Sequence, residues 1–173
     1  MVAVITNRAD AMLFFVCQWL EWGDLMAATH DALYERDFYG WANEQAALLR
    51  EGRLADADLG HIAEEIESMG RSEKRELVNR LTVLLTPLLK WQFQPAFRGR
   101  SWQLTVIEQR RKVAAHMDDN PSLASVLPAA FATAYGYAQI EAERETGLPE
   151  STFSDVCPYT IEQTLDERFW PGA

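Results

Sequence analysis

The chain has 173 residues, about the length of one domain, and its 48% hydrophobic residues can form a sizeable core. Its 16 basic and 26 acidic residues give a formal net charge of −10, which opposes non-specific attraction to nucleic acid or anionic lipid. Two cysteines exclude a disulfide framework and a zinc site made of thiolates alone. No apolar run reaches the ~18 residues of a membrane span, so we expect a cytoplasmic protein that does not enter the membrane.

An apolar run at residues 11–20 follows a single arginine near the start of the chain. A secretory signal requires a basic start, an apolar middle and a small-residue cleavage site, whereas acidic residues follow this run at once. Two alternatives are favoured over export. Residues 1–25 are either an extension from an over-long gene start, with Met26 as the natural first residue, or an extra helix docked on the body. The all-helical domain then spans residues 26–173.

The rest of the chain places apolar residues at steps of three and four, which is typical of amphipathic helices. No stretch alternates with a period of two, and neither Asn-Gly nor Asp-Gly hairpin turns occur. The pattern therefore predicts one all-α bundle of about five to six helices, with a possible extra helix at the N-terminus. The predicted helices span residues 31–51, 58–69, 72–94, 101–117, 120–145 and 160–167.

Helix boundaries follow from capping and stop residues. Ser72 and Ser101 are placed to cap the helices that follow them, and Asn120-Pro121 is typical of a helix start. Pro87 lies inside its predicted helix, where a proline costs ~3 kcal/mol or more, so we expect a kink or break near Leu84. Three glycines are placed to end predicted helices in the left-handed conformation: Gly52, Gly70 and Gly147.

Basic residues gather in one segment. Residues 71–112 hold ten basic and three acidic residues, a net charge of +7, with aromatic residues between them. Such a segment can hold phosphates and stack on bases, and Arg98 with Arg100 can hold a small anion. Two observations oppose nucleic-acid binding: the whole chain is acidic, and in a bundle positive helices can pair with negative ones while Trp91 and Trp102 lie in the core.

An acidic helix is the other candidate site. Glu64 and Glu65 lie three and four positions after a histidine and so share a helix face with it. The chain has neither Glu-x-x-His pairs nor a His-Glu-x-x-His motif, so we expect no metal and no cofactor. The face is either solvated, or Glu64 pairs with Arg80 or Lys90. A further alternative is an enzyme whose polar pocket combines both glutamates with Lys90 or Arg98.

Long motifs are spread over residues 31–171. They are LYERDFYGWANEQAALLR (33–50), HIAEEIESMGRSEKRELVNRL (61–81), LLKWQFQP (88–95), SW (101–102), EQRR (108–111), PSL (121–123) and ETGLP (145–149). Together they resemble a bacterial family of helical proteins, the domain of unknown function numbered twenty-nine. The resemblance implies an all-helical cytoplasmic protein, but it supplies no established activity, substrate or cofactor. In that family a histidine often precedes the Leu-Leu-Lys-Trp run, where this chain has Pro87, so any ligand or base there would be missing.

We predict a binding or interaction module rather than an enzyme. The chain has no Gly-x-Ser-x-Gly motif, phosphate-binding loop or dinucleotide fingerprint, and its many aromatic residues can line a groove or a self-association face. The expected partner is a second copy of the chain or another protein, and nucleic-acid binding and an enzyme remain the alternatives. Polar residues in the motifs can equally form a buried ion network. The candidate binding residues are Glu64, Glu65, Arg80, Lys90, Trp91, Gln94, Arg98, Arg100, Trp102 and Arg110.

Overall fold

The computed structural model describes residues 32–172, and every regular element among them is a helix. The all-α prediction is therefore confirmed. The α-helices are α2 (Phe38–Arg50), α3 (Leu59–Phe93), α4 (Arg100–Asp119), α5 (Leu127–Thr146) and α6 (Ile161–Leu165). Short 3-10 helices join them, namely η1 (Pro95–Phe97), η2 (Pro121–Ser125) and η3 (Glu150–Thr152). The extension predicted at residues 1–25, the start at Met26 and the docked N-terminal helix lie outside the described residues.

The chain divides into two compact units, one ending at Ser68 and the other beginning at Met69. Helix α3 begins in the first unit and continues into the second. Because the predicted boundary of the domain at residues 26–173 lies outside the described residues, that boundary stays a prediction.

The described part of the first unit holds a helical segment at residues 32–36, α2 and the first turns of α3. Asp37 caps α2, because its Oδ1 accepts a hydrogen bond from the amide of Gly40 at 2.9 Å. Gly52 follows the end of α2 with a φ of +73°. The predicted left-handed stop at this glycine is confirmed.

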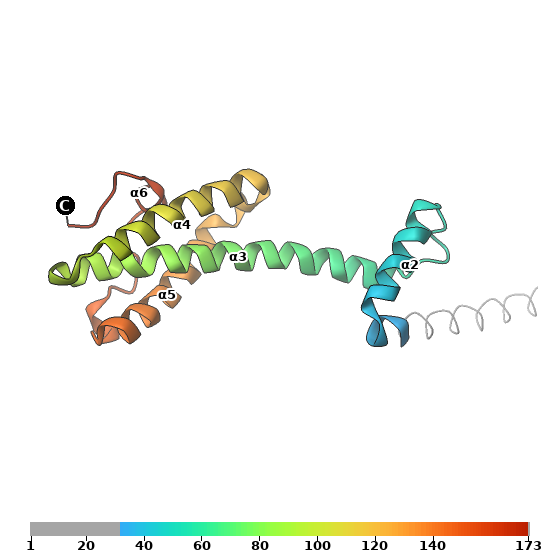
Figure 1. Cartoon of the computed structure of the whole chain (residues 1–173), viewed down its shortest axis with the longest axis horizontal. Coiled ribbons are helices and arrows are strands. Elements are labelled where there is room, and N and C mark those ends of the chain that lie inside the picture. The colour runs from blue at the N-terminus through green and yellow to red at the C-terminus, as the bar shows by residue number, and fades with distance from the viewer. Residues whose placement is uncertain (1–31, 173) are drawn as a thin grey trace, which may run out of the picture. The chain divides into compact units, whose positions relative to one another are not determined.

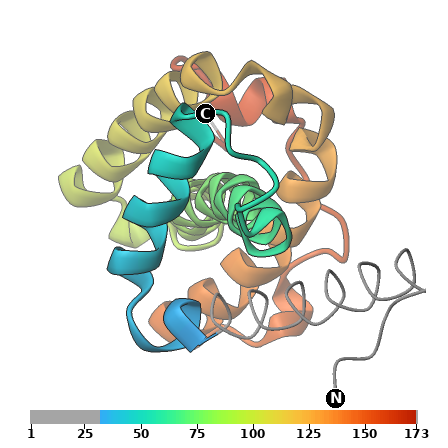
Figure 2. The same cartoon turned by 90° about the vertical axis from the view of Figure 1, so that its right-hand side faces the viewer.

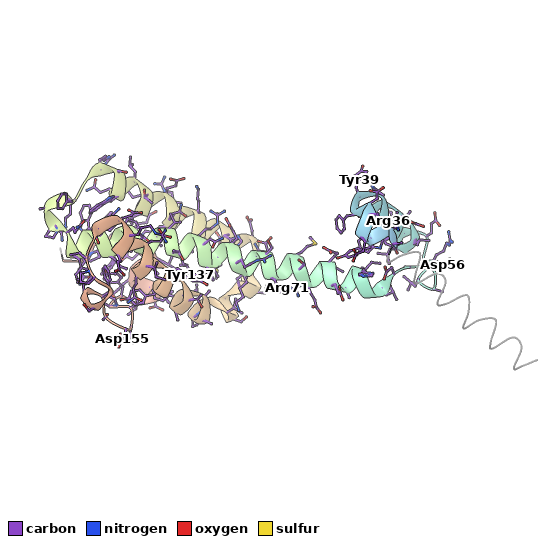
Figure 3. All side chains as sticks on the ribbon, turned by 90° about the horizontal axis from the view of Figure 1, so that it is seen from below. Arg36, Tyr39, Asp56, Arg71, Tyr137 and Asp155 are labelled. Carbon is purple, nitrogen blue, oxygen red and sulfur yellow. The ribbon has the colours of Figure 1, made fainter. Side chains whose placement is uncertain are left out.

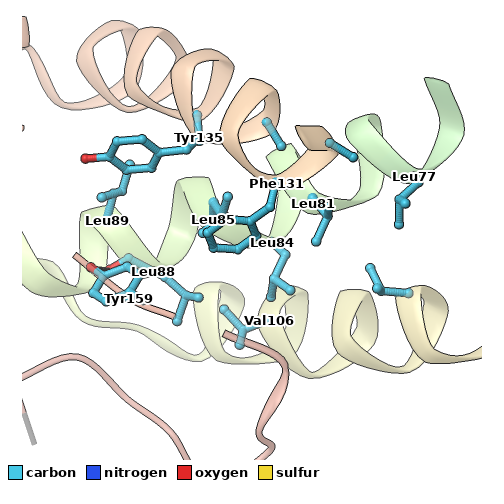
Figure 4. Packing of buried hydrophobic residues seen from close by; sticks show 14 of the residues in the cluster. Leu77, Leu81, Leu84, Leu85, Leu88, Leu89, Val106, Phe131, Tyr135 and Tyr159 are labelled. Atoms are coloured by element: carbon cyan, nitrogen blue, oxygen red, sulfur yellow. Dashed lines mark hydrogen bonds between the residues drawn. The ribbon is translucent and has the colours of Figure 1, made fainter. Parts of the chain in front are cut away.

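The second unit is a helical bundle in which α3 runs between α4 and α5 (Figures 1 and 2). Val106 of α4, Phe131 and Tyr135 of α5, and Tyr159 near the C-terminus belong to its hydrophobic core (Figure 4). Burying a leucine completely stabilises a fold by roughly 1.5–3 kcal/mol, so the leucine face of α3 contributes strongly to the stability of this unit. Its leucines with 0% exposure are Leu77, Leu81, Leu84, Leu85, Leu88 and Leu89.

Helix α3 is one continuous helix, and the helix end predicted at Gly70 is wrong. A glycine ends a helix when it takes the left-handed conformation, and Gly70 is not among the described glycines with positive φ. A glycine inside a helix costs only ~1 kcal/mol, which the buried leucines of the following turns offset. Ser72 consequently lies inside α3 and caps no helix.

Pro87 also lies inside α3, and it does not break the helix. The leucines on both sides of it, Leu84, Leu85, Leu88 and Leu89, have no exposed surface. Their packing holds both halves of the helix in place and offsets the ~3 kcal/mol that an internal proline costs. The break predicted near Leu84 is therefore wrong.

The starts of α4 and α5 differ from the predicted ones, whereas the end of α5 agrees with the prediction. Gly99 is the N-cap of α4 in an extended conformation, so Ser101 lies two residues too late to cap it. Pro121 begins the short η2, and α5 starts only at Leu127, with Pro128 in its first turn. A proline is tolerated there because first-turn amides have no helical partner. Gly147, with a φ of +70°, ends α5 as predicted.

Candidate functional site

A cavity of about 580 Å³ lies in the second unit, where three helices each contribute one face. Helix α3 lines it with residues spaced three and four apart, which keeps them on a single face: Asn79, Thr82, Val83, Thr86, Pro87 and Lys90. Its wall from α4 is Ser101, Trp102 and Thr105, and its wall from α5 is Tyr137, Glu141 and Glu145. Small-molecule sites have volumes of roughly 300–1,000 Å³, so the cavity can take a small ligand.

Lys90 carries the positive charge among the described residues that line the cavity. It is only 9% exposed. Its ammonium is hydrogen-bonded to Glu145 Oε2 and lies 4.4 Å from the ring centroid of Trp102. A buried ammonium destabilises a fold unless it is paired, and the ring face adds a cation–π contact. These two contacts allow α3 to hold a charge in the cavity wall and connect it to α4 and α5.

The threonine hydroxyls of the wall donate to the backbone of their own helices. Thr82 donates to Val78 O at 2.9 Å, Thr86 to Thr82 O at 2.9 Å, and Thr105 to Ser101 O at 3.1 Å. A hydroxyl has one proton and two lone pairs. Since each proton is already used within a helix, these hydroxyls can offer a ligand only acceptor lone pairs.

Pro87 adds a further acceptor to the same wall. Proline has no amide proton, so the carbonyl of Val83, four residues earlier, has no i+4 donor in α3. Both residues line the cavity. In a helix the carbonyl of residue i points along the axis toward residue i+4, which places this acceptor at the cavity wall.

Two exposed α5 side chains complete the rim. Tyr137 is 53% exposed (Figure 3), and Glu141 follows it by one turn. Both carboxylate oxygens of Glu141 accept from Arg144 Nη1 at 2.7 Å. Because Arg144 is exposed, solvent screens this pair. The cavity thus has two carboxylates, Glu141 and Glu145, against one ammonium.

Of the residues predicted from sequence, Lys90 and Trp102 meet in this cavity. Gln94 lies at the end of α3, where its amide donates to Thr146 O at 3.4 Å. Arg80 pairs with Glu76 on its own helix at 2.7 Å. The predicted pairing of Glu64 with Arg80 or Lys90 is therefore wrong. Arg80 pairs with Glu76, and Lys90 pairs with Glu145.

Arg110 holds the C-terminal segment, residues 160–172, against α4. It is 3% exposed, and it donates to Thr164 O at 2.9 Å and to Phe169 O at 2.8 Å. Burial lowers the pKa of its guanidinium, while Asp166 and Glu167 act in the opposite direction. Its side chain therefore ties two parts of the fold together.

Arg98 acts on the same segment from the turn before α4. It donates to Trp91 O at 2.8 Å and to Pro171 O at 3.4 Å. The rings of Trp91 and Trp170 lie 4.7 Å apart between centroids. Arg98 thus bonds to backbone carbonyls, while Arg100, with which it was expected to hold a small anion, is exposed.

Other basic residues of segment 71–112 have carboxylate partners nearby. Lys112 pairs with Glu108 at 2.5 Å, and Arg111 lies 4.0 Å from Glu167. Such exposed pairs contribute ~0–1 kcal/mol. Lys112 and Glu108 lie on the same helix, so the alternative in which positive helices pair with negative ones stays a prediction.

The two glutamates of the acidic helix lie in the first unit. Glu64 is exposed. Glu65 is half-buried and accepts a hydrogen bond from the hydroxyl of Tyr34 at 2.5 Å. This hydrogen bond to a carboxylate raises the pKa of Tyr34 to about 12. Glu65 therefore helps to hold the segment at residues 32–36 against the start of α3.

Asp58 organises the start of α3. Its carboxylate lies 2.7 Å from His61 Nδ1 and accepts from Trp41 Nε1 at 3.3 Å. Burial acts to raise the pKa of Asp58, but the hydrogen bonds from His61 and Trp41 together lower it below its usual value. Gln45 accepts from the Asp58 amide at 2.8 Å. These contacts join α2 to α3 within the first unit.

Sequence analysis missed the acceptor side of the cavity, namely Glu145, Glu141, Tyr137 and the threonines of α3. A signal was present, because Tyr137, Glu141 and Glu145 repeat every four residues and so share one helix face. This face can be recognised as part of a site only when α5 is known to pack beside Lys90. Sequence spacing within one helix cannot supply this information.

The family model described as "Domain of unknown function DUF29" matches residues 33–170. No curated protein and no solved structure matches the chain. Within residues 32–172 no group of three or more histidine, cysteine, aspartate or glutamate side chains is arranged to hold a metal ion. In the same range, no helix combines the length and hydropathy required to cross a membrane.

Proposed function

The chain belongs to the DUF29 family, whose description assigns no activity, and we propose from the cavity geometry that it is a non-catalytic binding domain. Its ligand occupies the cavity between α3, α4 and α5. The observation that carries this proposal is Lys90, a nearly buried ammonium in the wall of a 580 Å³ cavity. Binding sites combine a cavity of this size with a few fixed polar groups.

The hydrogen bonding of the wall supports binding rather than catalysis. A hydroxyl nucleophile requires an adjacent base, but Thr82, Thr86 and Thr105 donate to helix carbonyls. The ammonium of Lys90 is already engaged by Glu145. These groups are arranged to hold a ligand in place. We further place the domain in the cytoplasm, for which its low cysteine content is the support.

The test begins with native mass spectrometry of protein purified gently at low salt. A mass above an integer multiple of the 19.7 kDa chain identifies a retained ligand, and the integer gives the oligomeric state. Amide chemical shifts are then recorded with a set of small amines, carboxylates and sugars at millimolar concentration. We expect shifts at the residues that line the cavity.

Lys90→Met, with Lys112→Met as the control, separates the cavity from the general surface. Both variants remove one positive charge, but Lys112 lies on the exposed side of α4, paired with Glu108. Loss of the cavity shifts in Lys90→Met alone supports the proposal. Absence of retained mass together with absence of shifts at the cavity for every compound would contradict it.

A further inference from the structure

We infer that the ligand of the cavity is a small organic cation rich in N–H donors, an aliphatic ammonium or a guanidinium. This inference rests on the proposed function, and it names the class of ligand which that site takes. The evidence is the balance of donors, acceptors and charges among the groups at the cavity wall.

The wall offers several acceptors, beside the donors of Asn79, Ser101, Trp102 and Tyr137. The hydroxyl protons of Thr82, Thr86 and Thr105 are donated to helix carbonyls, which leaves their lone pairs for a ligand. The Val83 carbonyl adds an acceptor, because Pro87 supplies it with no amide proton. A ligand with N–H donors can satisfy these acceptors, which an anion without protons cannot do.

Charge leads to the same class of ligand. The ammonium of Lys90 is already engaged by Glu145 and by the face of Trp102. Glu141 is balanced only by Arg144, which is exposed and free to reorient. The lining is thus net negative, and so is the chain as a whole, at −10. Both fields raise the local concentration of cations.

The aromatic residues add a reason why the cation is organic. Tyr137 lies one turn before Glu141 on α5 and is half-exposed at the rim (Figure 3). An ammonium or guanidinium on an apolar stem can contact its ring while donating to the carboxylate. A metal ion has no apolar stem to place on Val83 and Pro87, which also line the cavity.

Two sources can supply this chemistry: a free polyamine, or a lysine side chain of a polypeptide. Isothermal titration calorimetry with spermidine and with the blocked tripeptide acetyl-Gly-Lys-Gly-amide distinguishes them. Citrate and maltose serve as the anionic and neutral probes at the same ionic strength. We expect spermidine or the tripeptide to bind, and the one that binds more tightly identifies the source.

Glu141→Gln is the decisive variant, and Glu143→Gln is its control. Both remove one negative charge from α5, but Glu143 is exposed and does not line the cavity. We expect Glu141→Gln to weaken spermidine binding about tenfold, because one charge-assisted contact is lost, and Glu143→Gln to change it less than twofold. Glu145 is left unchanged because its removal would leave Lys90 buried without a partner.

Each outcome decides between the two proposals. If both glutamine variants weaken spermidine equally, the cation is attracted only by net charge, and the inference is overturned. If citrate or maltose binds instead, with shifts at the cavity amides, the binding function stands and its ligand class is wrong. If no probe binds, the inference is overturned, whereas the proposed function is decided separately by the retained mass and the cavity shifts.

Discussion

Arg110→Met tests whether the buried guanidinium holds the C-terminal segment in place. Methionine has a similar length and is apolar, so the substitution removes the hydrogen bonds while keeping much of the packing. The two shortest bonds, 2.9 Å to Thr164 O and 2.8 Å to Phe169 O, involve a charged donor. Bonds of this kind contribute ~1.5–3 kcal/mol each, or about 3–6 kcal/mol for both.

Part of this contribution is offset by the desolvation of the guanidinium, which is 3% exposed and has a pKa lowered by burial. We therefore expect Arg110→Met to reduce the free energy of unfolding by about 3 kcal/mol. Urea denaturation measures this loss. In amide hydrogen exchange, we expect the substitution to accelerate exchange more in residues 160–172 than in α3, because Arg110 is bonded to that segment.

The control is Arg111→Met, the next residue of α4. Arg111 is exposed and lies 4.0 Å from Glu167, so its replacement is expected to change stability by less than about 0.5 kcal/mol. If Arg110→Met unfolds at the same urea concentration as Arg111→Met, the guanidinium adds nothing to stability and the structural role given to it here is wrong.

Three further predictions concern stability. Gly70→Ala is expected to raise the free energy of unfolding by about 1 kcal/mol, because Gly70 is helical and its Cβ would meet no atom within 4 Å; a loss of stability would mean that α3 is interrupted there. Leu85→Ala is expected to lower it by about 2–5 kcal/mol, whereas Val83→Ala, at a position 46% exposed, lowers it by less than about 1 kcal/mol in urea denaturation. Asp58 has a folded-state pKa below the usual 3.8, so its contribution to stability is complete above pH 3.8 and is lost as the pH falls through the folded-state value. Thermal unfolding followed against pH is expected to show this acid sensitivity reduced in Asp58→Asn but not in Asp56→Asn, and equal profiles would exclude a role for Asp58.

The elements that sequence predicts well depend on local chemistry. Gly52 and Gly147 are left-handed because the chain must turn away from a helix end, and glycine takes that conformation without a Cβ clash. The leucine face of α3 follows from spacing alone. Such features require no knowledge of which helices are neighbours.

The helix end predicted at Gly70 and the break predicted from Pro87 are wrong because tertiary packing opposes them. An internal glycine weakens a helix by ~1 kcal/mol and an internal proline by ~3 kcal/mol or more. The six fully buried leucines of the same helix together contribute more than that. Local signals therefore predict a break that packing prevents. A sequence shows the local cost of a residue but not the burial that opposes it.

The candidate site was predictable only in part, for a related reason. Lys90 and Trp102 carry chemistry that can be recognised in the sequence, and they do meet. Arg98 and Arg110 carry the same kind of chemistry, but their partners are backbone carbonyls. Every residue has a carbonyl, so no sequence pattern distinguishes an arginine that ties two segments together from one that awaits a ligand.

Pro87→Ala tests both the cost of a proline inside α3 and its role in the proposed binding site. Restoring the amide proton removes a cost of ~3 kcal/mol. Against this, alanine releases ~0.4–1 kcal/mol of entropy to the unfolded chain and loses two buried methylene groups of ~0.8 kcal/mol each. The free energy of unfolding is therefore expected to change by less than about 1 kcal/mol. Spermidine affinity is expected to fall about fivefold, because the new amide engages the Val83 carbonyl.

Pro128→Ala is the matched control, since Pro128 lies in the first turn of α5, where an amide has no helical partner. It is expected to change neither stability nor affinity appreciably. If Pro87→Ala raises stability by 2–3 kcal/mol and leaves spermidine binding unchanged, the freed carbonyl has no role in the cavity. A proline inside a helix would then be only a tolerated defect, whereas unchanged stability with weaker binding makes it part of the binding wall.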